Sequence, residues 1–500
     1  MGDAPVEMQE SLDRYRAVRR QLEERILPLA TSVDGRRFSY QASLHGLELQ
    51  AGSYVVLEQD DGRRLGQVVT LEVARHPAME LAAGEAGGAD HRAQVVIRAA
   101  EGEGRILSGD GSPFHDATVR PATAGEVRDH LDETASRRAR LVVGELLLAP
   151  GVPFSLDAGG FGRHTFLCGQ SGSGKTYSLG VLLEQLFLET DLHIVVLDPN
   201  SDFVRLGELR PDADDTRAVR YSEATRSLAV RRAGDGLALL LAELEPAVQA
   251  AALRLDPVVD REEYAELAAL TEGGEALSPQ RLERLEREGG EEGRRLVSRA
   301  RNLGLLRWGI WAGGAGRSIL PELARDDLRC FVVDLGSLGT REEQALASAA
   351  VLGELWRRRE ERRPVLIVVD EAHNVCPARP GDPLTAIATE YAVRIAGEGR
   401  KFGLYLLVST QRPQKVHENV LSQCDNLLLM RMNSLADLGF VSEVFSFVPP
   451  SLLDRATTFR QGESLAAGLI APHPAFLRFG QRLAQEGGGD VPADWSKPKS

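Results

Sequence analysis

The residues best suited to chemistry form one glycine-rich run, Gly169-Gln170-Ser171-Gly172-Ser173-Gly174-Lys175-Thr176. The run matches the phosphate-binding loop of nucleotide-hydrolysing proteins at every defined position. Its glycines let successive backbone N–H groups turn toward phosphate oxygens, and the following helix directs its positive N-terminus at the same charge. Lys175 would contact the β- and γ-phosphates, and the Thr176 hydroxyl would bind Mg²⁺. The loop therefore predicts an ATPase with ATP and Mg²⁺ as its cofactors.

A second motif is the apolar run 365–371, VLIVVDE, which ends in two acids. A central strand of this kind delivers carboxylates to a nucleotide site. Asp370 would hold the Mg²⁺ shell, commonly through water. Glu371 would polarise the attacking water as general base. Many buried strands end in an acid, so the prediction depends on the pairing of this run with the loop at 169–176.

Three more polar residues lie in the C-terminal half. Gln411 ends the strand-like run LYLLVSTQ, where it would touch water and γ-phosphate, or else cap a helix. Arg400 lies in the turn GEGRKFG and would either enter a neighbouring site or remain solvated. Arg431 interrupts the apolar run LLLMRM, and a buried charge needs a partner, so a structural ion pair is favoured over catalysis.

Two aspartates follow the apolar run DLHIVVLDP. Asp198 ends the run and Asp202 comes four residues later. In open parallel sheets the carboxyl edge faces the ligand crevice. Both side chains are therefore further candidates to orient Mg²⁺ or water.

The elements that must hold these residues alternate between strand and helix patterns. HTFLCG, TYSLGVLLEQLFLET and DLHIVVLDP read as strand, helix and strand, and four further apolar runs follow between 330 and 432. This alternation predicts an α/β fold with a mainly parallel sheet. We expect the ATPase core at 123–221 and 321–475, with a helical insertion at 222–320 that is rich in Leu, Ala, Glu and Arg.

The N-terminal part has a different pattern. Apolar residues three or four apart between 8 and 26 predict an amphipathic helix within 1–30. Short β-branched runs over 31–122 predict a small antiparallel barrel or sandwich. This module contains no catalytic constellation, so we interpret it as a docking domain. Residues 476–500 are expected to form a C-terminal tail.

Composition narrows the class of protein. The 500 residues are 43% hydrophobic, enough for two or three globular domains. The net charge of −14 argues against coating of a polyanion but leaves room for a local basic surface. The four cysteines are far apart and lie in or beside apolar runs, as buried thiols in a reducing cytosol do. No signal peptide or membrane-spanning run is found, so a cytoplasmic protein without a membrane partner is expected.

The ordered set of motifs resembles one family, the HerA/FtsK group of P-loop ring ATPases, and most closely its HerA-type DNA translocases. The resemblance covers roughly 30–475 and rests on GQSGSGKT, LDPNSDF, VVDEAHN, EGRKFG, STQRP and VLSQCDNLLLMRMN. It implies a RecA-like core that assembles as a homo-hexamer and moves double-stranded DNA through its pore. It also implies that the N-terminal module is a barrel that docks an effector such as a nuclease.

The family pattern also implies residue roles. Lys175 and Thr176 would bind nucleotide and Mg²⁺, Glu371 would be the base, and Gln411 the sensor. Arg400 would be a finger that acts on the neighbouring subunit. The second acidic motif of the family often reads Gly-Glu-Tyr, whereas this chain has Ser201-Asp202-Phe203, with an acid one methylene shorter.

Three functions remain open on the sequence. The first is ATP hydrolysis coupled to DNA translocation or helicase-like activity. The second is a motor for protein or nucleoprotein, as in conjugation-type ATPases. The third is an ATP-binding ring scaffold that assembles an effector. The presence of Lys175, Thr176, Asp370 and Glu371 speaks against a scaffold with little turnover. The effector, the polarity of movement, the pore-lining residues and the role of 222–320 are not assigned.

Overall fold

The computed structural model describes residues 28–488 apart from 45–47, 61, 76–78, 83–93, 98, 136–138, 214, 273–278 and 312–316, and also residues 10, 12–13 and 16–17. Most of the amphipathic helix expected within 1–30 and the tail beyond 488 lie outside the described residues. Within the described part, no helix has the length and apolar content needed to span a bilayer.

The N-terminal domain is a closed barrel. Its sheet has the order β2-β1-β9-β3-β4-β8-β5, and an additional β2–β8 pairing closes it. The strands are β1 (Leu29–Ser32), β2 (Arg37–Ser43), β3 (Tyr54–Gln59), β4 (Gly62–Val68), β5 (Glu72–Val73), β8 (Ala99–Ile106) and β9 (Phe114–Pro121). Alternating side chains such as Phe38, Tyr40, Val55 and Leu57 fill the interior. Of the two folds left open by the sequence, the barrel is therefore correct.

Two smaller elements belong to the same half of the chain. β6 (Met79–Ala82) and β7 (Gln94–Ile97) form a separate two-stranded sheet. Helix α2 (Ala124–Thr134) follows the barrel and begins with a capping box, in which Thr123 and Glu126 satisfy each other's backbone N–H groups. Arg120 of β9 forms ion pairs with Glu126 and with Glu58 of β3, which joins the helix to the barrel.

The second domain is built on a twelve-stranded sheet of order β11-β10-β21-β20-β19-β12-β18-β17-β13-β16-β14-β15. The strands from β19 to β14 are parallel, and β10, β11, β20 and β21 are antiparallel. Their bounds are β10 (Arg140–Leu146), β11 (Pro153–Asp157), β12 (His164–Cys168), β13 (His193–Asp198), β14 (Leu228–Ala233), β15 (Gly236–Leu237), β16 (Cys330–Asp334), β17 (Val365–Val369), β18 (Leu404–Thr410), β19 (Cys424–Met430), β20 (Glu463–Gly468) and β21 (Ala475–Phe479). The expected α/β fold with a mainly parallel sheet is confirmed.

Helices cover both faces of this sheet. On one face α3 (Lys175–Glu189) packs on the same side as Leu167, Ile194 and Val196. On the other, α9 (Arg341–Arg357) and α10 (Pro383–Glu398) pack with Phe166 and Val195. Successive strand residues point to opposite faces, so strands buried on both sides read as continuous apolar runs. The remaining core helices are α4 (Asp215–Ala224), α11 (Glu418–Leu421), α12 (Leu435–Val444) and α13 (Pro450–Leu453).

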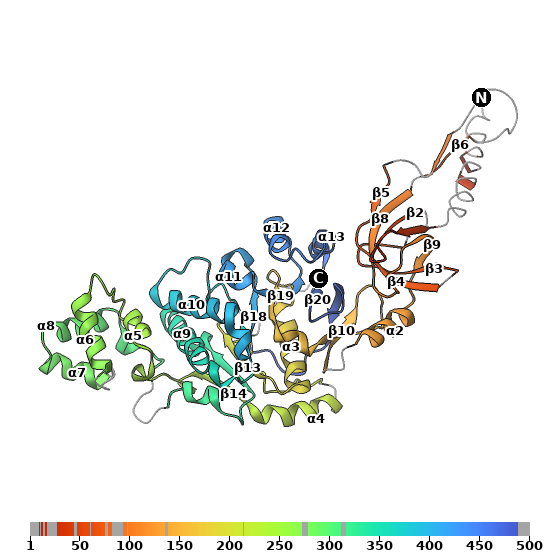
Figure 1. Ribbon diagram of the computed structural model, residues 1–500. Helices are drawn as coiled ribbons and strands as arrows, with labels where there is room; N and C mark the ends of the chain where they lie inside the picture. Colours follow the sequence, from red (N-terminus) through yellow and green to blue (C-terminus); the bar gives the residue numbers. More distant parts are fainter. Residues whose placement is uncertain are drawn as a thin grey trace, which may run out of the picture.

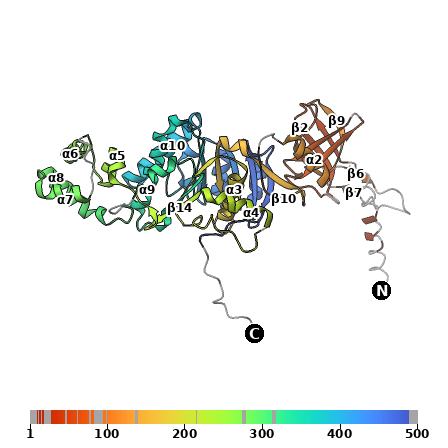
Figure 2. The same ribbon diagram turned by 90° about the horizontal axis from the view of Figure 1, so that it is seen from below.

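The helical lobe and the barrel lie at opposite ends of the core (Figures 1 and 2). The lobe contains α5 (Pro246–Ala252), α6 (Arg261–Glu272), α7 (Pro279–Glu288) and α8 (Glu291–Asn302). Its start differs from the expected insertion at 222–320, because β14 within that range pairs with β16. The run LAVRRA looks polar for a strand, but Arg231 pairs with Glu322 and Arg232 with Asp334.

The chain after 476 also differs from the expected tail. β21 pairs with both β10 and β20, so it lies within the core sheet, between those two strands. This end of the core also contacts the barrel. His473 Nε2 lies 2.9 Å from the Tyr54 hydroxyl, and the Gln67 side-chain amide donates to the Pro474 carbonyl at 2.9 Å.

Candidate nucleotide site

The glycine-rich loop joins β12 to α3 at the carboxyl edge of the parallel sheet. Gly174 caps α3 with a φ of 90°, and Gly172 has a φ of 71°, conformations that favour glycine. A Cβ on Gly169 would lie 2.7 Å from Met430 Cβ, so the backbone of the loop is packed closely on β19. The Gln170 side chain accepts the Asn433 N–H at 3.0 Å. The loop thus has the turned backbone that its sequence predicts.

Lys175 is the cation of this site. Its ammonium donates to Asp370 Oδ1 at 2.7 Å and to Ser409 Oγ at 3.1 Å, and lies 3.1 Å from Glu371 Oε1. Burial lowers the pKa of Lys175, but Asp370 and Glu371 outweigh burial, so the pKa is raised above its ordinary value. Lys175 therefore stays charged in a buried environment.

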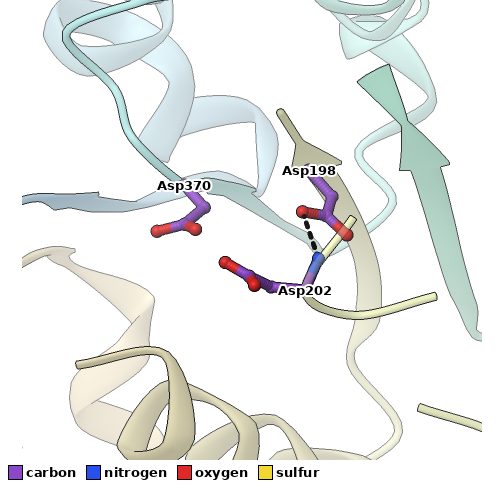
Figure 3. Close-up of side chains that lie close together, drawn as sticks. All are labelled: Asp198, Asp202 and Asp370. Atoms are coloured by element: carbon purple, nitrogen blue, oxygen red, sulfur yellow. Dashed lines mark hydrogen bonds between the residues drawn. The ribbon is translucent and has the colours of Figure 1, made fainter. Parts of the chain in front are cut away.

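Three aspartates lie close together (Figure 3), and one of them, Asp370, contacts Lys175. One oxygen from each of Asp198, Asp202 and Asp370 lies within 4.8 Å of the others. The Asp198 carboxylate accepts the backbone N–H of Asp202 at 3.0 Å, drawn as the dashed line in Figure 3. The Thr176 hydroxyl is 3.5 Å from Asp202 Oδ2. Sequence reasoning named all four residues, and the fold brings them together.

Two of the three clustered aspartates have raised pKa values. Burial, with a smaller contribution from Asp202, raises the pKa of Asp198 to about 7. Burial and the Asp370 charge raise the pKa of Asp202 to about 6. Burial and neighbouring negative charge thus disfavour the ionised form of these carboxylates. A divalent cation such as Mg²⁺, which takes oxygen ligands, would offset this cost. Asp370 Oδ2 and Ser173 Oγ are buried without a hydrogen bond within the described residues, so each has capacity for a metal shell or a phosphate.

Glu371 is held differently from the aspartates. Its backbone has a φ of 42°, in the left-handed region that non-glycine residues rarely adopt. Gln411 Nε2 donates to its Oε1 at 3.3 Å, and His373 Nδ1 lies 3.2 Å from its Oε2. Burial raises its pKa, but the hydrogen bond from His373 and the charge of Lys175 leave the pKa below its ordinary value. Glu371 is therefore an ionised carboxylate in the neighbourhood of Lys175.

Comparison with known proteins agrees with this geometry. Residues 141–282 match the family model described as "Helicase HerA, central domain". The core thus resembles the HerA central domain over these residues. The P-loop ATPase expected from the sequence, and its resemblance to HerA-type proteins, are confirmed.

Two relatives are both described as "DNA double-strand break repair helicase HerA". That of Pyrococcus furiosus is 24% identical over 388 residues, 67% of this chain and 68% of that protein. That of Sulfurisphaera tokodaii is 30% identical over 178 residues, 34% of this chain, and the match spans about a third of that relative, 35%.

Among solved structures, VirB4 of Thermoanaerobacter pseudethanolicus matches with 17% identity, covering 69% of this chain and 97% of that one, with a TM-score of 0.47. The bacterial conjugative coupling protein TrwB matches with 14% identity, covering 74% of this chain and 95% of that one, with a TM-score of 0.47.

Arg400 lies away from the nucleotide site of its own chain. It precedes β18, at the amino end of a strand whose carboxyl end leads to Gln411. Seven strand residues span about 23 Å, so Arg400 and the loop at 169–176 occupy opposite edges of the sheet. The Arg400 guanidinium is 2.9 Å from Asp425 Oδ2, and its side chain remains 38% exposed.

Arg431 contacts the glycine-rich loop directly. Its Nη2 donates to the Gly172 carbonyl at 2.8 Å, and its own carbonyl accepts the Gln170 N–H at 2.9 Å. Among the described residues it has no acidic partner, so the structural ion pair favoured by the sequence is wrong. The reason is that β19 ends beside the loop, where free backbone carbonyls can take the guanidinium.

His373 is a site residue that sequence reasoning missed, as is Ser409, which accepts from Lys175. His373 lies 3.2 Å from Glu371 Oε2 and 3.1 Å from the Thr410 hydroxyl. The motif VVDEAHN contains it two residues after Glu371, and a histidine so near a candidate base was the available signal.

Proposed function

We propose that this chain is an ATP-hydrolysing motor that moves double-stranded DNA and works with a docked effector such as a nuclease. The HerA-type core supports the motor, and the naming of the two relatives as DNA repair helicases supports DNA as the substrate. ATP is the fuel that the glycine-rich loop fits.

The roles of the site residues follow from their positions. The loop N–H groups and Lys175 would bind the phosphates, so Lys175 would exchange part of its contact with Asp370 for the nucleotide. Thr176 and Asp370 would hold Mg²⁺, with Asp198 and Asp202 beside them. The metal, when bound, neutralises charge on the β- and γ-phosphates.

The single observation that carries the proposal is the setting of Glu371. An ionised carboxylate next to Lys175, oriented by His373 and Gln411, has what a general base for water needs. Gln411 donates a hydrogen bond to this base, so its side chain is suited to sense whether the attacking water is present. A ring scaffold that only binds ATP has no use for such an arrangement.

Arg400 would complete the site of a neighbouring subunit. Its place at the amino edge of the sheet separates it from its own loop by the length of a strand, which supports action in trans. A guanidinium on the γ-phosphate accelerates transfer on the order of a thousandfold or more. Full turnover then requires assembly, which we propose to be a homo-hexameric ring.

The barrel would dock the effector. It holds no residue of the nucleotide cluster and stands at the end of the core away from the helical lobe (Figure 1). A partner bound there would not obstruct nucleotide exchange.

The first test measures ATP turnover with and without duplex DNA at several salt concentrations. A duplex translocase should hydrolyse faster with DNA, and its DNA affinity should fall steeply with salt as counterion release loses its entropic gain. Hydrolysis indifferent to any DNA would favour a protein or nucleoprotein motor. Absence of turnover would favour the scaffold.

The second test mixes subunits that are each inactive alone. Arg400→Ala subunits keep a complete loop, and Lys175→Ala subunits keep the arginine. In mixed rings an intact loop can receive an intact arginine from its neighbour, so turnover should partly return. No recovery in rings shown by native mass spectrometry to be mixed would defeat the trans assignment.

A further inference from the structure

The residues that follow β21 also pack on the core. Residues 481–488, here called the C-terminal strap, continue from β21 and contact α3. Arg482 is 1% exposed, and its Nε lies 3.4 Å from Glu184 Oε1. The Glu184 carboxylate also accepts the Leu483 and Ala484 N–H groups at 2.7 and 2.8 Å. This buried pair anchors the strap to the helix that carries Lys175 and Thr176.

Beyond the anchor, the strap pairs with the segment that follows β13. The Arg210 N–H donates to the Leu483 carbonyl, and the Gln485 N–H to the Glu208 carbonyl, both at 2.8 Å. The Gly487 N–H then donates to the Asp202 carbonyl at 3.0 Å. The strap therefore connects α3 to the backbone of Asp202, one of the three clustered aspartates.

Asp202 needs such a restraint. Its carboxylate faces those of Asp198 and Asp370, and like charges repel strongly at this burial. Ser201 before it has a φ of 62°, so the turn is not held by favourable local backbone conformation. Hydrogen bonds from the Asp202 and Phe203 N–H groups to Asp198 hold the turn on the strand side, and the strap holds it on the other.

The contact depends on two glycines. A Cβ on Gly487 would lie 2.1 Å from the Ser201 carbonyl oxygen, and one on Gly488 would lie 2.7 Å from Asp202 Oδ1. Only residues without a side chain allow this approach, and the second of these contacts is to the carboxylate itself.

We propose that the C-terminal strap is a positioning element that fixes the Asp202 carboxylate for Mg²⁺, so that metal affinity depends on residues 487 and 488. The proposal rests on the Mg²⁺–nucleotide site of the proposed function. It assigns Gly487 and Gly488 a part in that site although neither offers a side-chain ligand. Loss of such an outer support weakens metal binding on the order of tenfold.

The test is a Mg²⁺ titration of the binding of a fluorescent ATP analogue to the full chain. Gly487→Ala and Gly488→Ala should each raise the Mg²⁺ concentration at half-saturation about tenfold, while binding without Mg²⁺ stays as in the wild type. Gly480→Ala is the matched control, because its Cβ would lie an ordinary 3.6 Å from the Val143 carbonyl oxygen. It should leave the Mg²⁺ titration unchanged.

A double-mutant cycle separates positioning from general damage. In an Asp202→Asn background, Gly488→Ala should add no further loss of Mg²⁺ affinity, because its target carboxylate is gone. If Gly487→Ala does not fold, the Mg²⁺ titration of Gly488→Ala tests the proposal alone. That variant should fold, because its Cβ would contact a side-chain atom and not the backbone. An unchanged Mg²⁺ titration in the folded variants would overturn the proposal, as would equal losses with and without Mg²⁺. If the wild type itself shows no Mg²⁺-dependent binding, the proposed function fails as well.

Discussion

Helix α3 connects two buried charge clusters that are composed in opposite ways. At its start, Lys175 meets Asp370 and Glu371, with Asp198 and Asp202 close by, so acids outnumber the base. In its third turn, the buried Glu184 carboxylate faces the Arg482 guanidinium and accepts the Leu483 and Ala484 N–H groups. Such a pair of opposite charges needs no further cation. An excess of buried carboxylate is stabilised only when a cation arrives, so it marks the functional end of the helix.

The largest effect should come from the unbalanced cluster. Glu371→Gln removes the base and keeps the shape, so ATP turnover should fall on the order of a thousandfold while ATP still binds. Stability without ligand should fall slightly, because the contacts of Glu371 with Lys175 and His373, which hold its pKa below the ordinary value, are weakened. Phosphate release and calorimetric ATP binding measure both. Near-normal turnover would show that another group is the base.

The balanced cluster should respond in stability. Arg482→Met leaves the Glu184 charge buried and unpaired, which should lower the free energy of unfolding by about 3–5 kcal/mol. Denaturant unfolding measures it. Adding Glu184→Gln removes the orphaned charge and should restore part of the loss, since the amide oxygen can accept only one of the Leu483 and Ala484 N–H groups. If the double variant is as unstable as the single one, charge balance is not what this pair contributes.

The pH dependence distinguishes the clusters further. The Asp202 pKa is about 6 when folded against 3.8 ordinarily, so between these values the folded state binds a proton that the unfolded chain releases. Without Mg²⁺, stability contributed at Asp202 therefore falls as pH rises from about 4 to about 6.

Asp202→Asn should remove this dependence. The unfolding free energy of the variant, relative to wild type, should rise across that window and level off above it. Mg²⁺ should reduce the difference, because it stabilises only the wild-type carboxylate. A difference independent of pH would mean that Asp202 is not crowded by its neighbours.

The smallest effect belongs to an exposed pair near the strap. Arg205 and Glu208 are about half exposed, with side chains 43% and 54% accessible. Arg205→Ala should change the unfolding free energy by no more than about 1 kcal/mol, since solvent screens such pairs. If Arg205→Ala lowers the unfolding free energy as much as Arg482→Met does, burial does not explain why the two ion pairs differ in their effect on stability.

The sequence predicts the unbalanced cluster well because its parts are local motifs. GQSGSGKT and VLIVVDE each specify backbone and side chains over a few residues, and parallel strands bring their ends to one edge. Asp198 and Asp202 were found by the same rule. The position of Arg400 at the opposite edge also follows from strand order.

The balanced cluster could not be predicted in this way. Glu184 looks like an ordinary polar residue in an apolar helix, and Arg482 lies in a segment expected to be a tail. Their pairing arises only when β21 joins the sheet. For a similar reason, the strand β14 was not predicted. Its Arg231 and Arg232 form ion pairs with acids that are distant in sequence, Glu322 and Asp334.

The place of β21 has a consequence for the order in which a newly made chain can fold. β10, the first strand of the core sheet in chain order, has β11 and β21 as its sheet neighbours, and β21 is synthesised after all other strands of that sheet. The same holds for Arg482, which pairs with Glu184 of α3. Non-local pairing of this kind is slow to form. The barrel, whose strands all precede β10, can close before the core is synthesised, whereas the core sheet stays incomplete until β21 has been made.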